Sequence, residues 1–413
     1  MTPTEGIPLD RAWLDRANRV TVGASQTNSR RHGNVGPVTF PAFARAGAGA
    51  YLRLTDDSLV IDLAGANGAV ALGYQAHVVT GSLHTHFMEG GTLSLPSTLE
   101  VETSERMVRA LPFPSLVRWV RTGSEAVSAA VAIAQEATGR AQIGAFKGAY
   151  HGWHPWTRSV VPVDDTVAAG PKSFPMKPIS GNDIDTPYWE HWVERGIAAI
   201  IVESPRWKTV DDAYIRWLTQ LRKDCTEQGV LLIFDDVVYA FRFATGGLQE
   251  TTGVCPDLAC FSKALGNGVP VGCVTGIPRL MESTGFRVSS TFGGEILGLA
   301  AASAVLELHA EMDVCGKLRE IGVDLRQRLD DALTDTPISV YGTPQHFRFV
   351  AARKKGDAVG TKDARLDRFL SHCMRDETQR VLIHRDADNV NLAMTADVRD
   401  MIAGTVGRAA RRC

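Results

Sequence analysis

The sequence predicts an α/β protein whose larger domain is built around a mostly parallel sheet. Short apolar segments at residues 198–203, 230–234 and 258–261 lack polar alternation, so we expect strands that are buried on both faces. Helical patterns at residues 124–138 and 213–227 alternate with strands along the chain. A strand, a helix and a second strand in this order favour parallel pairing through right-handed crossovers.

The other elements of this domain are shorter or less regular. Residues before about 55 show little periodicity. Further helices are expected at residues 78–87 and 98–110, and further strands at residues 50–54, 59–62, 116–120, 142–146 and 271–276. The helix at 98–110 is expected to place its apolar side inward, which consists of Leu99, Val101, Met107 and Val108.

The C-terminal part predicts a smaller α+β domain. A long helix at residues 295–311 leads out of the larger domain. Beyond it we expect helices at 318–333 and 396–411, strands at 338–341 and 347–352, and an exposed loop at 354–362. The expected domain limits are residues 1–60 for the N-terminal segment of the small domain, 61–310 for the large domain with the functional site, and 311–413 for the C-terminal small domain.

Composition limits the classes of function. The chain has 413 residues, 44% hydrophobic and 22% charged, which is typical of a globular protein with a large core. The net charge of -2 gives no electrostatic reason to expect nucleic acid or a membrane as a partner. The seven cysteines are an odd number without a C-x-x-C pair, which fits a reducing compartment. Residues 1–19 contain no apolar signal region, so we expect a cytoplasmic protein.

Lys263 is the first candidate functional residue. It follows the apolar strand at residues 258–261 and begins a glycine-rich turn. Lysine is rarely buried without a reason, and burial lowers the pKa of a lysine amine and frees it as a nucleophile. The sequence therefore indicates either a Schiff-base lysine or a solvated lysine after a strand.

Gly123 and Ser124 stand where a strand passes into a helix. We expect Ser124 to cap this helix, whose first amides would then be free to bind a phosphate group. An ordinary helix cap is the alternative.

Asp235 and Asp236 end an apolar strand, which is the sheet edge where ligands of parallel sheets bind. Paired carboxylates there could bind a metal, act as acid and base, or hold a cationic ring nitrogen. A structural aspartate that caps the next turn is the simpler possibility.

Tyr150 and His151 begin a Tyr-His-Gly-Trp-His segment. His151 and His154 could be metal ligands, but the sequence has no further ligand cluster at suitable spacing, so we expect no metal site. An aromatic residue before a tight turn can instead stack on a flat cofactor. A phosphate cradle, a stacking aromatic, a strand-end carboxylate and a strand-end lysine together match pyridoxal 5'-phosphate, whose protonated ring withdraws electrons from a substrate carbanion.

The chain resembles the class III, fold type I pyridoxal-phosphate aminotransferases, in the branch of glutamate-1-semialdehyde aminomutase. The matching motifs, in the order of the family, are Gly123-Ser124-Glu125-Ala126, Tyr150-His151-Gly152, Val202-Glu203, Phe234-Asp235-Asp236-Val237, Pro256-Asp257, Lys263 and Ser290-Thr291-Phe292-Gly293-Gly294. The match covers residues 20–310 well. It implies the fold type I architecture, a large domain with a mostly parallel sheet covered by helices and a smaller α+β domain.

The resemblance also implies a role for each matching residue. Lys263 would form the Schiff base and move the proton, and Asp235 would pair with the ring nitrogen. The remaining cofactor contacts would come from Gly123, Ser124, Tyr150, His151, Glu203, Val237 and Thr291. Thr291 would reach the phosphate of the neighbouring subunit, which implies a homodimer with shared active sites.

Three positions depart from the family pattern. Asp236 replaces a glutamate, Ser204 intervenes between Glu203 and Pro205, and Tyr239-Ala240 replaces a Thr-Gly pair. On the substrate side, Arg30, or alternatively Arg31, stands where the aminomutase has a carboxylate-binding arginine. Asn67 stands where the aminomutase has a substrate-lining tryptophan, which argues for a larger or more polar substrate.

The resemblance implies an aminotransferase that moves an amino group from an amino acid or amine donor to a carbonyl acceptor. An intramolecular aminomutase is the alternative, followed by a racemase. A non-catalytic protein of this fold is a third class, and the intact lysine, aspartate and phosphate motifs speak against it.

Overall fold

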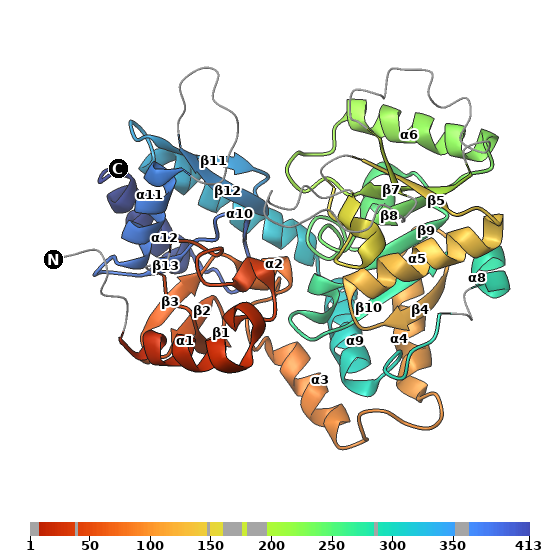
Figure 1. Ribbon diagram of the computed structural model, residues 1–413, viewed down its shortest axis with the longest axis horizontal. Helices are drawn as coiled ribbons and strands as arrows, with labels where there is room; N and C mark the ends of the chain where they lie inside the picture. Colours follow the sequence, from red (N-terminus) through yellow and green to blue (C-terminus); the bar gives the residue numbers. More distant parts are fainter. Residues whose placement is uncertain are drawn as a thin grey trace. The chain divides into compact units, whose positions relative to one another are not determined.

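The computed structural model describes residues 8–37, 40–146, 149–159, 176–179, 196–284, 288–351 and 363–413 (Figure 1). The expected loop at 354–362 and the last residue of the strand expected at 347–352 lie outside these ranges. The chain forms two compact units, one of residues 1–76, 206–208 and 316–413, the other of residues 77–205 and 209–315.

The second unit is built around a seven-stranded sheet of order β4-β10-β9-β8-β7-β5-β6. Its strands are β4 Leu116–Val120, β5 Gln142–Phe146, β6 Met176–Ile179, β7 Ile197–Glu203, β8 Leu231–Asp235, β9 Leu258–Phe261 and β10 Gly272–Gly276. Neighbours from β9 to β6 pair in parallel, which confirms the predicted α/β class. Strand β10 is antiparallel to β4 and β9, because the connection at residues 262–271 is too short for a parallel crossover.

Seven helices in the described part of this unit accompany the sheet. They are α3 His77–Phe87, α4 Thr98–Arg109, α5 Gly123–Thr138, α6 Asp212–Glu227, α7 Leu248–Thr252, α8 Pro278–Thr284 and α9 Ile296–Glu311. One expectation for α4 is wrong, since Val101 is 59% exposed. The buried side of α4 runs through Leu99, Thr103 and Met107, which are four residues apart and so lie on one helix face.

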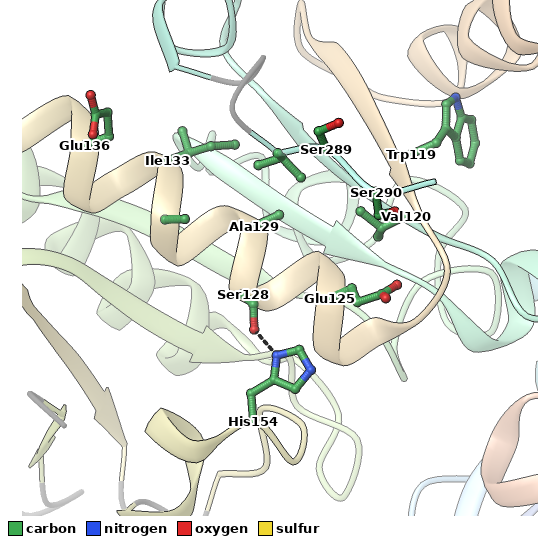
Figure 2. A pocket seen from close by; sticks show the side chains of 12 residues that line it. Trp119, Val120, Glu125, Ser128, Ala129, Ile133, Glu136, His154, Ser289 and Ser290 are labelled. Carbon is green, nitrogen blue, oxygen red and sulfur yellow. Dashed lines mark hydrogen bonds between the residues drawn. The ribbon is translucent and has the colours of Figure 1, made fainter. Parts of the chain in front are cut away.

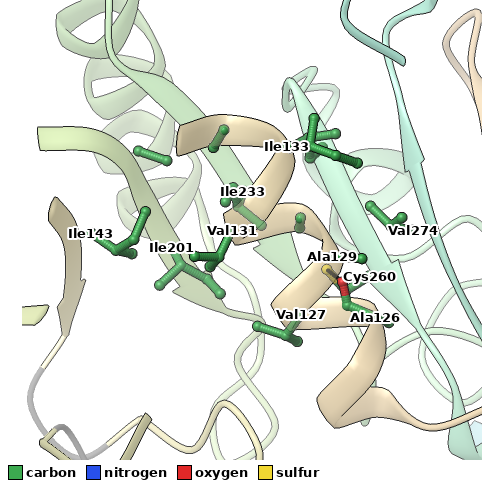
Figure 3. Packing of buried hydrophobic residues seen from close by; sticks show 14 of the residues in the cluster. Ala126, Val127, Ala129, Val131, Ile133, Ile143, Ile201, Ile233, Cys260 and Val274 are labelled. Carbon is green, nitrogen blue, oxygen red and sulfur yellow. Dashed lines mark hydrogen bonds between the residues drawn. The ribbon is translucent and has the colours of Figure 1, made fainter. Parts of the chain in front are cut away.

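Helix α5 packs against the central strands of this sheet. Figure 2 shows its outer side, where Ser128 and Glu136 help to line a cavity of about 380 Å³ with residues of β4. Figure 3 shows its inner side, where Val131 lies near the sheet residues Ile201 and Ile233, and Ala126 lies beside Cys260 of β9. This apolar contact fixes the helix and therefore the position of its first turn.

The first unit contains two smaller sheets. One is four-stranded, with β1 Ala44–Ala48, β2 Tyr51–Leu54, β3 Leu59–Asp62 and β13 Val381–Leu382. The other is three-stranded, with β11 Ile338–Gly342, β12 His346–Ala351 and β14 Asp388–Asn389. The helices of this unit are α1 Pro8–Val20, the short α2 Gly65–Gly68, most of α10 Val314–Ala332, α11 Ala364–Met374 and α12 Ala396–Ala410.

The hairpin of β2 and β3 agrees with the sequence prediction, whereas α1, β1 and α11 were not predicted. Within the part of the chain that the structure describes, no helix combines the length and the apolar character that a membrane crossing requires.

Candidate active site

Three of the predicted site residues lie at the carboxyl ends of neighbouring parallel strands. Glu203 ends β7 and pairs in register with Asp235, which ends β8. Asp235 in turn pairs in register with Cys260 of β9, and Lys263 follows the end of that strand. The sheet therefore brings Glu203, Asp235 and Lys263 to the same edge, which is where ligands of parallel sheets bind.

Lys263 has an unusual backbone conformation. Its φ of 48° lies in the left-handed region, which a residue with a Cβ rarely adopts. The preceding residue, Ser262, is fixed because its hydroxyl donates a 2.7 Å hydrogen bond to the carbonyl of Val271. Strained positions of this kind concentrate at functional sites, where the surrounding structure holds them.

Asp235 and His151 form a buried pair. His151 Nδ1 lies 2.7 Å from Asp235 Oδ2, and the amide of Val237 donates to Asp235 Oδ1 at 3.2 Å. Asp235 is 5% exposed and His151 is 1% exposed. The other ring nitrogen of His151, Nε2, is buried without a hydrogen-bond partner among the described residues. His151 therefore fixes the orientation of the Asp235 carboxylate.

The first turn of α5 differs from the sequence prediction. Thr122, not Ser124, caps this helix: the Thr122 hydroxyl accepts from the Glu125 amide at 3.2 Å, and the Glu125 carboxylate accepts from the Thr122 amide at 3.1 Å. Ser124 is already helical because the Thr-x-x-Glu pattern forms a capping box that begins two residues earlier. The amides of Gly123 and Ser124 have no acceptor within the helix, so they stay available to an anion.

Two glycines bring the site segments into close contact. A Cβ on Gly123 would lie 2.8 Å from Val237 Cγ1, and a Cβ on Gly152 would lie 2.5 Å from Ser124 Oγ. Gly152 also has a φ of 95°, which favours glycine. The importance of Gly152 was missed at the sequence level, although it belongs to the Tyr-His-Gly motif.

Tyr150 lies beside this contact with an accessible ring. Its amide donates to Glu203 Oε2 at 2.9 Å, and its side chain is 46% exposed. His154 serves another element, since its Nδ1 contacts the hydroxyl of Ser128 on α5. The two histidines of the segment therefore have different partners.

Thr291 lies in an exposed turn that is tied to the first turn of α5. The guanidinium of Arg121 forms an ion pair with Glu295, and Glu295 caps α9 through the amides of Leu297 and Gly298. Thr291 itself is exposed. Arg121 thus connects the start of α5 to the segment that carries Thr291.

Asp236 and Ser204, two departures from the family motif, contact each other. The Ser204 hydroxyl donates to Asp236 Oδ1 at 2.6 Å, and the Leu248 amide donates to the same oxygen at 2.9 Å. Burial raises the pKa of Asp236 to about 7, and the charge of Asp235 acts in the same direction. Ser204 therefore donates a hydrogen bond to Asp236, whose side chain is shorter than the glutamate of the family pattern.

The two candidate substrate residues lie in the first unit. The amide of Asn67 donates to the Ser29 hydroxyl at 2.9 Å, which places Asn67 next to the turn that carries Arg30. Arg30 and Arg31 are both exposed. The structure thus brings Asn67 and the Arg30 segment together.

Comparison with known proteins supports one family. The model of the class III aminotransferases matches residues 33–342. Glutamate-1-semialdehyde 2,1-aminomutase from Natronomonas pharaonis is 32% identical over 386 residues, which is 88% of this chain and 84% of the relative. The protein of the same name from Thermomicrobium roseum is 32% identical over 328 residues, 76% of this chain and 75% of the relative.

Solved structures share the fold. The FumI protein of a Sphingopyxis species, in a pyridoxal-phosphate form, has a TM-score of 0.85 and 24% identity, covering 98% of this chain and 96% of its own. An omega-transaminase from Sphaerobacter thermophilus has a TM-score of 0.82 and 22% identity, covering 99% and 98%. The fold and the strand-end site define a pyridoxal-phosphate enzyme of fold type I. Within that class, the chain belongs to the class III aminotransferase family.

Proposed function

We propose that this protein is an aminotransferase that moves an amino group between an amino acid donor and a carbonyl acceptor in a ping-pong cycle. The buried Asp235–His151 pair, at the sheet edge that also carries Lys263, is the observation that supports it most strongly. A carboxylate held in one orientation by a buried histidine suits a cationic ring nitrogen, because it offers a charged acceptor that water does not screen.

The residues at this edge fit pyridoxal phosphate. The free amides of Gly123 and Ser124 suit the phosphate, and the exposed ring of Tyr150 offers a stacking surface. Val237, which contacts Gly123, would lie on the other side of the ring, and Glu203 would lie near the ring oxygen or hold the Tyr150 segment. Lys263 would hold the cofactor through its Nζ.

Pyridoxal phosphate supplies an electron sink that stabilises negative charge on the substrate carbon. The protein's own residues then control protons. Asp235 keeps a proton on the ring nitrogen, since its charge stabilises the cationic form. Lys263 Nζ would take the proton from the substrate carbon and return it.

We also propose a homodimer with shared active sites. Apolar side chains of two segments are more than half exposed, namely Phe87, Met88, Leu95 and Phe292. The segments lie side by side, since the Ile296 amide donates to the Gly91 carbonyl at 2.9 Å. Such a patch suits a second copy of the chain, to which the adjacent Thr291 would contribute a phosphate contact.

An intramolecular aminomutase is the second candidate. The relatives at 32% identity carry that name. Against it, the position that the aminomutase fills with tryptophan is Asn67, whose amide is engaged with Ser29.

An absorbance spectrum tests the shared part of both candidates. The purified protein with pyridoxal phosphate should develop a visible band that Lys263→Ala abolishes, and a protein that takes up no cofactor would contradict the proposal. Single amino donors then separate the candidates. Conversion of the band with stoichiometric release of a keto acid indicates the transferase, whereas isomerisation without a donor or a released keto acid indicates the aminomutase.

A further inference from the structure

Ser204 joins the ends of β7 and β8 beyond their last paired residues. Glu203 pairs in register with Asp235, and the amide of the next residue, Ser204, donates to the Asp235 carbonyl at 3.1 Å. The Ser204 hydroxyl donates to Asp236 Oδ1 at 2.6 Å. Ser204 is 2% exposed and Asp236 is fully buried, so little water competes for the second bond. One serine therefore holds two successive residues at the end of β8.

Asp236 extends this connection to two other segments. Its amide donates to the Cys260 carbonyl at 3.0 Å, on the strand that leads to Lys263. Its Oδ1 also accepts from the Leu248 amide at 2.9 Å. Asp236 thereby ties the end of β8 to β7, to β9 and to the start of α7.

The residues just before Ser204 and Asp236 carry side chains that we assign to the cofactor. Glu203 Oε2 accepts from the Tyr150 amide at 2.9 Å, which fixes the segment with the stacking ring. Asp235, paired with its buried histidine, would hold the ring nitrogen. Each member of the buried pair is joined through one peptide bond to one of these carboxylates, so a shift of the pair moves both of them.

We propose that Ser204 and Asp236 are positioning residues, which hold the carboxylates next to them in place for the cofactor ring. This inference rests on the proposed aminotransferase function and adds two residues to its site. Both positions depart from the family pattern, and the structure links them, since the additional serine supplies a donor that the shorter carboxylate accepts. Charges that are held in advance need no rearrangement when a ligand binds, so a fixed edge binds the ring more tightly.

Ser204→Ala removes the hydrogen bond of this pair. Cofactor affinity should fall about threefold to tenfold, the effect of one lost hydrogen bond. At saturating cofactor, the circular dichroism of the visible band should also become weaker, because this signal depends on how the ring is held in the site. A serine with a purely structural role would lower Tm and leave the dichroism of the loaded protein unchanged.

Three further variants complete this test, with all titrations at pH 6. Asp236→Ala should weaken affinity and dichroism at least as much as Ser204→Ala, because it removes the acceptor. Asp236→Asn should largely restore both, since it keeps an oxygen acceptor and burial raises the pKa of Asp236 to about 7, which leaves the parental acid neutral at pH 6. Ser58→Ala is the matched control, because it removes a hydrogen bond of the same length, 2.6 Å to Asp56 Oδ1, in the first unit. It should leave affinity and dichroism unchanged.

Hydrogen–deuterium exchange of the full chain tests the positioning without relying on the cofactor. In Ser204→Ala, amides of residues 149–153 should exchange faster, as well as those of residues 203–206, because the Tyr150 amide depends on the Glu203 carboxylate. Faster exchange at residues 203–206 alone would show that the serine acts only locally, and would contradict the positioning role.

The outcomes separate the inference from the proposed function. Unchanged affinity and dichroism in Ser204→Ala, or the same loss in Ser58→Ala, would overturn the positioning role while the aminotransferase proposal stands. A parent protein that takes up no cofactor would contradict the proposed function instead. Exchange at residues 149–153 would then still decide whether Ser204 holds Glu203 and the segment bonded to it.

Discussion

Asp236 lies in an environment that differs strongly from that of an ordinary surface carboxylate. It is fully buried beside Asp235, and one of its oxygens, Oδ2, has no hydrogen-bond partner among the described residues. Gly247 lies so close that an added Cβ would be 2.4 Å from that oxygen. Ser204 and Leu248 stabilise only the other oxygen, so the neutral acid is favoured over the carboxylate.

Asp236→Asn should therefore stabilise the protein in a pH-dependent way. The folded-state pKa of about 7 lies above the ordinary value of 3.8. The free energy of unfolding of the parent is therefore highest below pH 4, and it falls as the pH rises toward 7 and the buried group ionises. The loss at pH 8 is about 4 kcal/mol, which the neutral amide avoids. The variant's Tm relative to the parent should increase by several degrees between pH 5 and pH 8, measured with cofactor saturating.

Asp376→Asn is the control for this experiment. Hydrogen bonds from Arg408 lower the pKa of Asp376 to about 2, so its titration lies below the range tested. This variant should lower Tm by the same amount at pH 5 and pH 8. A constant difference between Asp236→Asn and the parent across this range would show that Asp236 is charged throughout.

His151→Phe should weaken cofactor binding through Asp235. The substitution removes the buried donor 2.7 Å from Asp235 Oδ2 and leaves the carboxylate less well oriented. Hydrogen bonds to charged groups contribute about 1.5–3 kcal/mol, so cofactor affinity should fall by about tenfold to a hundredfold. Equilibrium titration with pyridoxal phosphate measures this. His154→Phe is the matched control, because His154 contacts Ser128 instead, and it should bind as the parent does.

The sequence identified site residues whose own side chains carry the chemistry. It did not identify residues whose role depends on contacts with distant parts of the chain. Lys263 and Asp235 could be named because a lysine and a carboxylate at strand ends are recognisable by type and position. The link between Ser204 and Asp236 joins residues far apart in the chain, so no local pattern indicates it. The bond between Asn67 and Ser29 is hidden for the same reason.

At the scale of elements, the central strands and helices were predictable from two patterns. Short unbroken apolar segments indicate buried strands, and apolar residues at helical spacing indicate helices. The strands at 116–120, 142–146 and 258–261 agree with the structure residue for residue. Helix α1 was missed because its surroundings are rich in glycine, arginine and asparagine, and β13 and β14 are too short to have a period. The start of α5 was misplaced because Ser124 and Thr122 are both good caps, and only the glutamate at 125 distinguishes them.

This distinction gives a prediction for α5. Thr122→Ala removes the cap and should lower the free energy of unfolding by about 1 kcal/mol, while Thr122→Ser should restore it. Ser124→Ala should leave stability nearly unchanged, because Ser124 is not the cap. Loss of the Ser124 hydroxyl should instead weaken the binding of the cofactor, because this hydroxyl is proposed to contact the phosphate. Denaturant unfolding of the cofactor-free protein measures the first effect, and cofactor titration measures the second. An equal loss of stability in Thr122→Ala and Ser124→Ala would contradict the capping assignment.

At the scale of the whole molecule, the exposed apolar patch and Thr291 lead to a test of the proposed homodimer. Met88 is 84% exposed and Leu95 is 78% exposed, on a segment that lies beside the one carrying Thr291. Met88→Asp with Leu95→Asp should therefore shift the protein from dimer to monomer in sedimentation velocity and weaken cofactor binding together. Monomers that bind cofactor as tightly as the parent would rule out a shared site.

A mixed dimer tests whether Thr291 acts on the partner's site. Thr291→Ala alone should weaken cofactor binding about tenfold, the effect of one hydrogen bond to a charged phosphate. Lys263→Ala alone should give no visible band. In the proposed dimer, one Lys263→Ala subunit would pair with one Thr291→Ala subunit. The site with an intact lysine would then receive its threonine from the other subunit. Purified mixed dimers carrying two different tags should therefore show the visible band at the cofactor concentration that suffices for the parent, at one site per dimer. If the mixed dimer needs as much cofactor as Thr291→Ala alone, Thr291 acts within its own subunit.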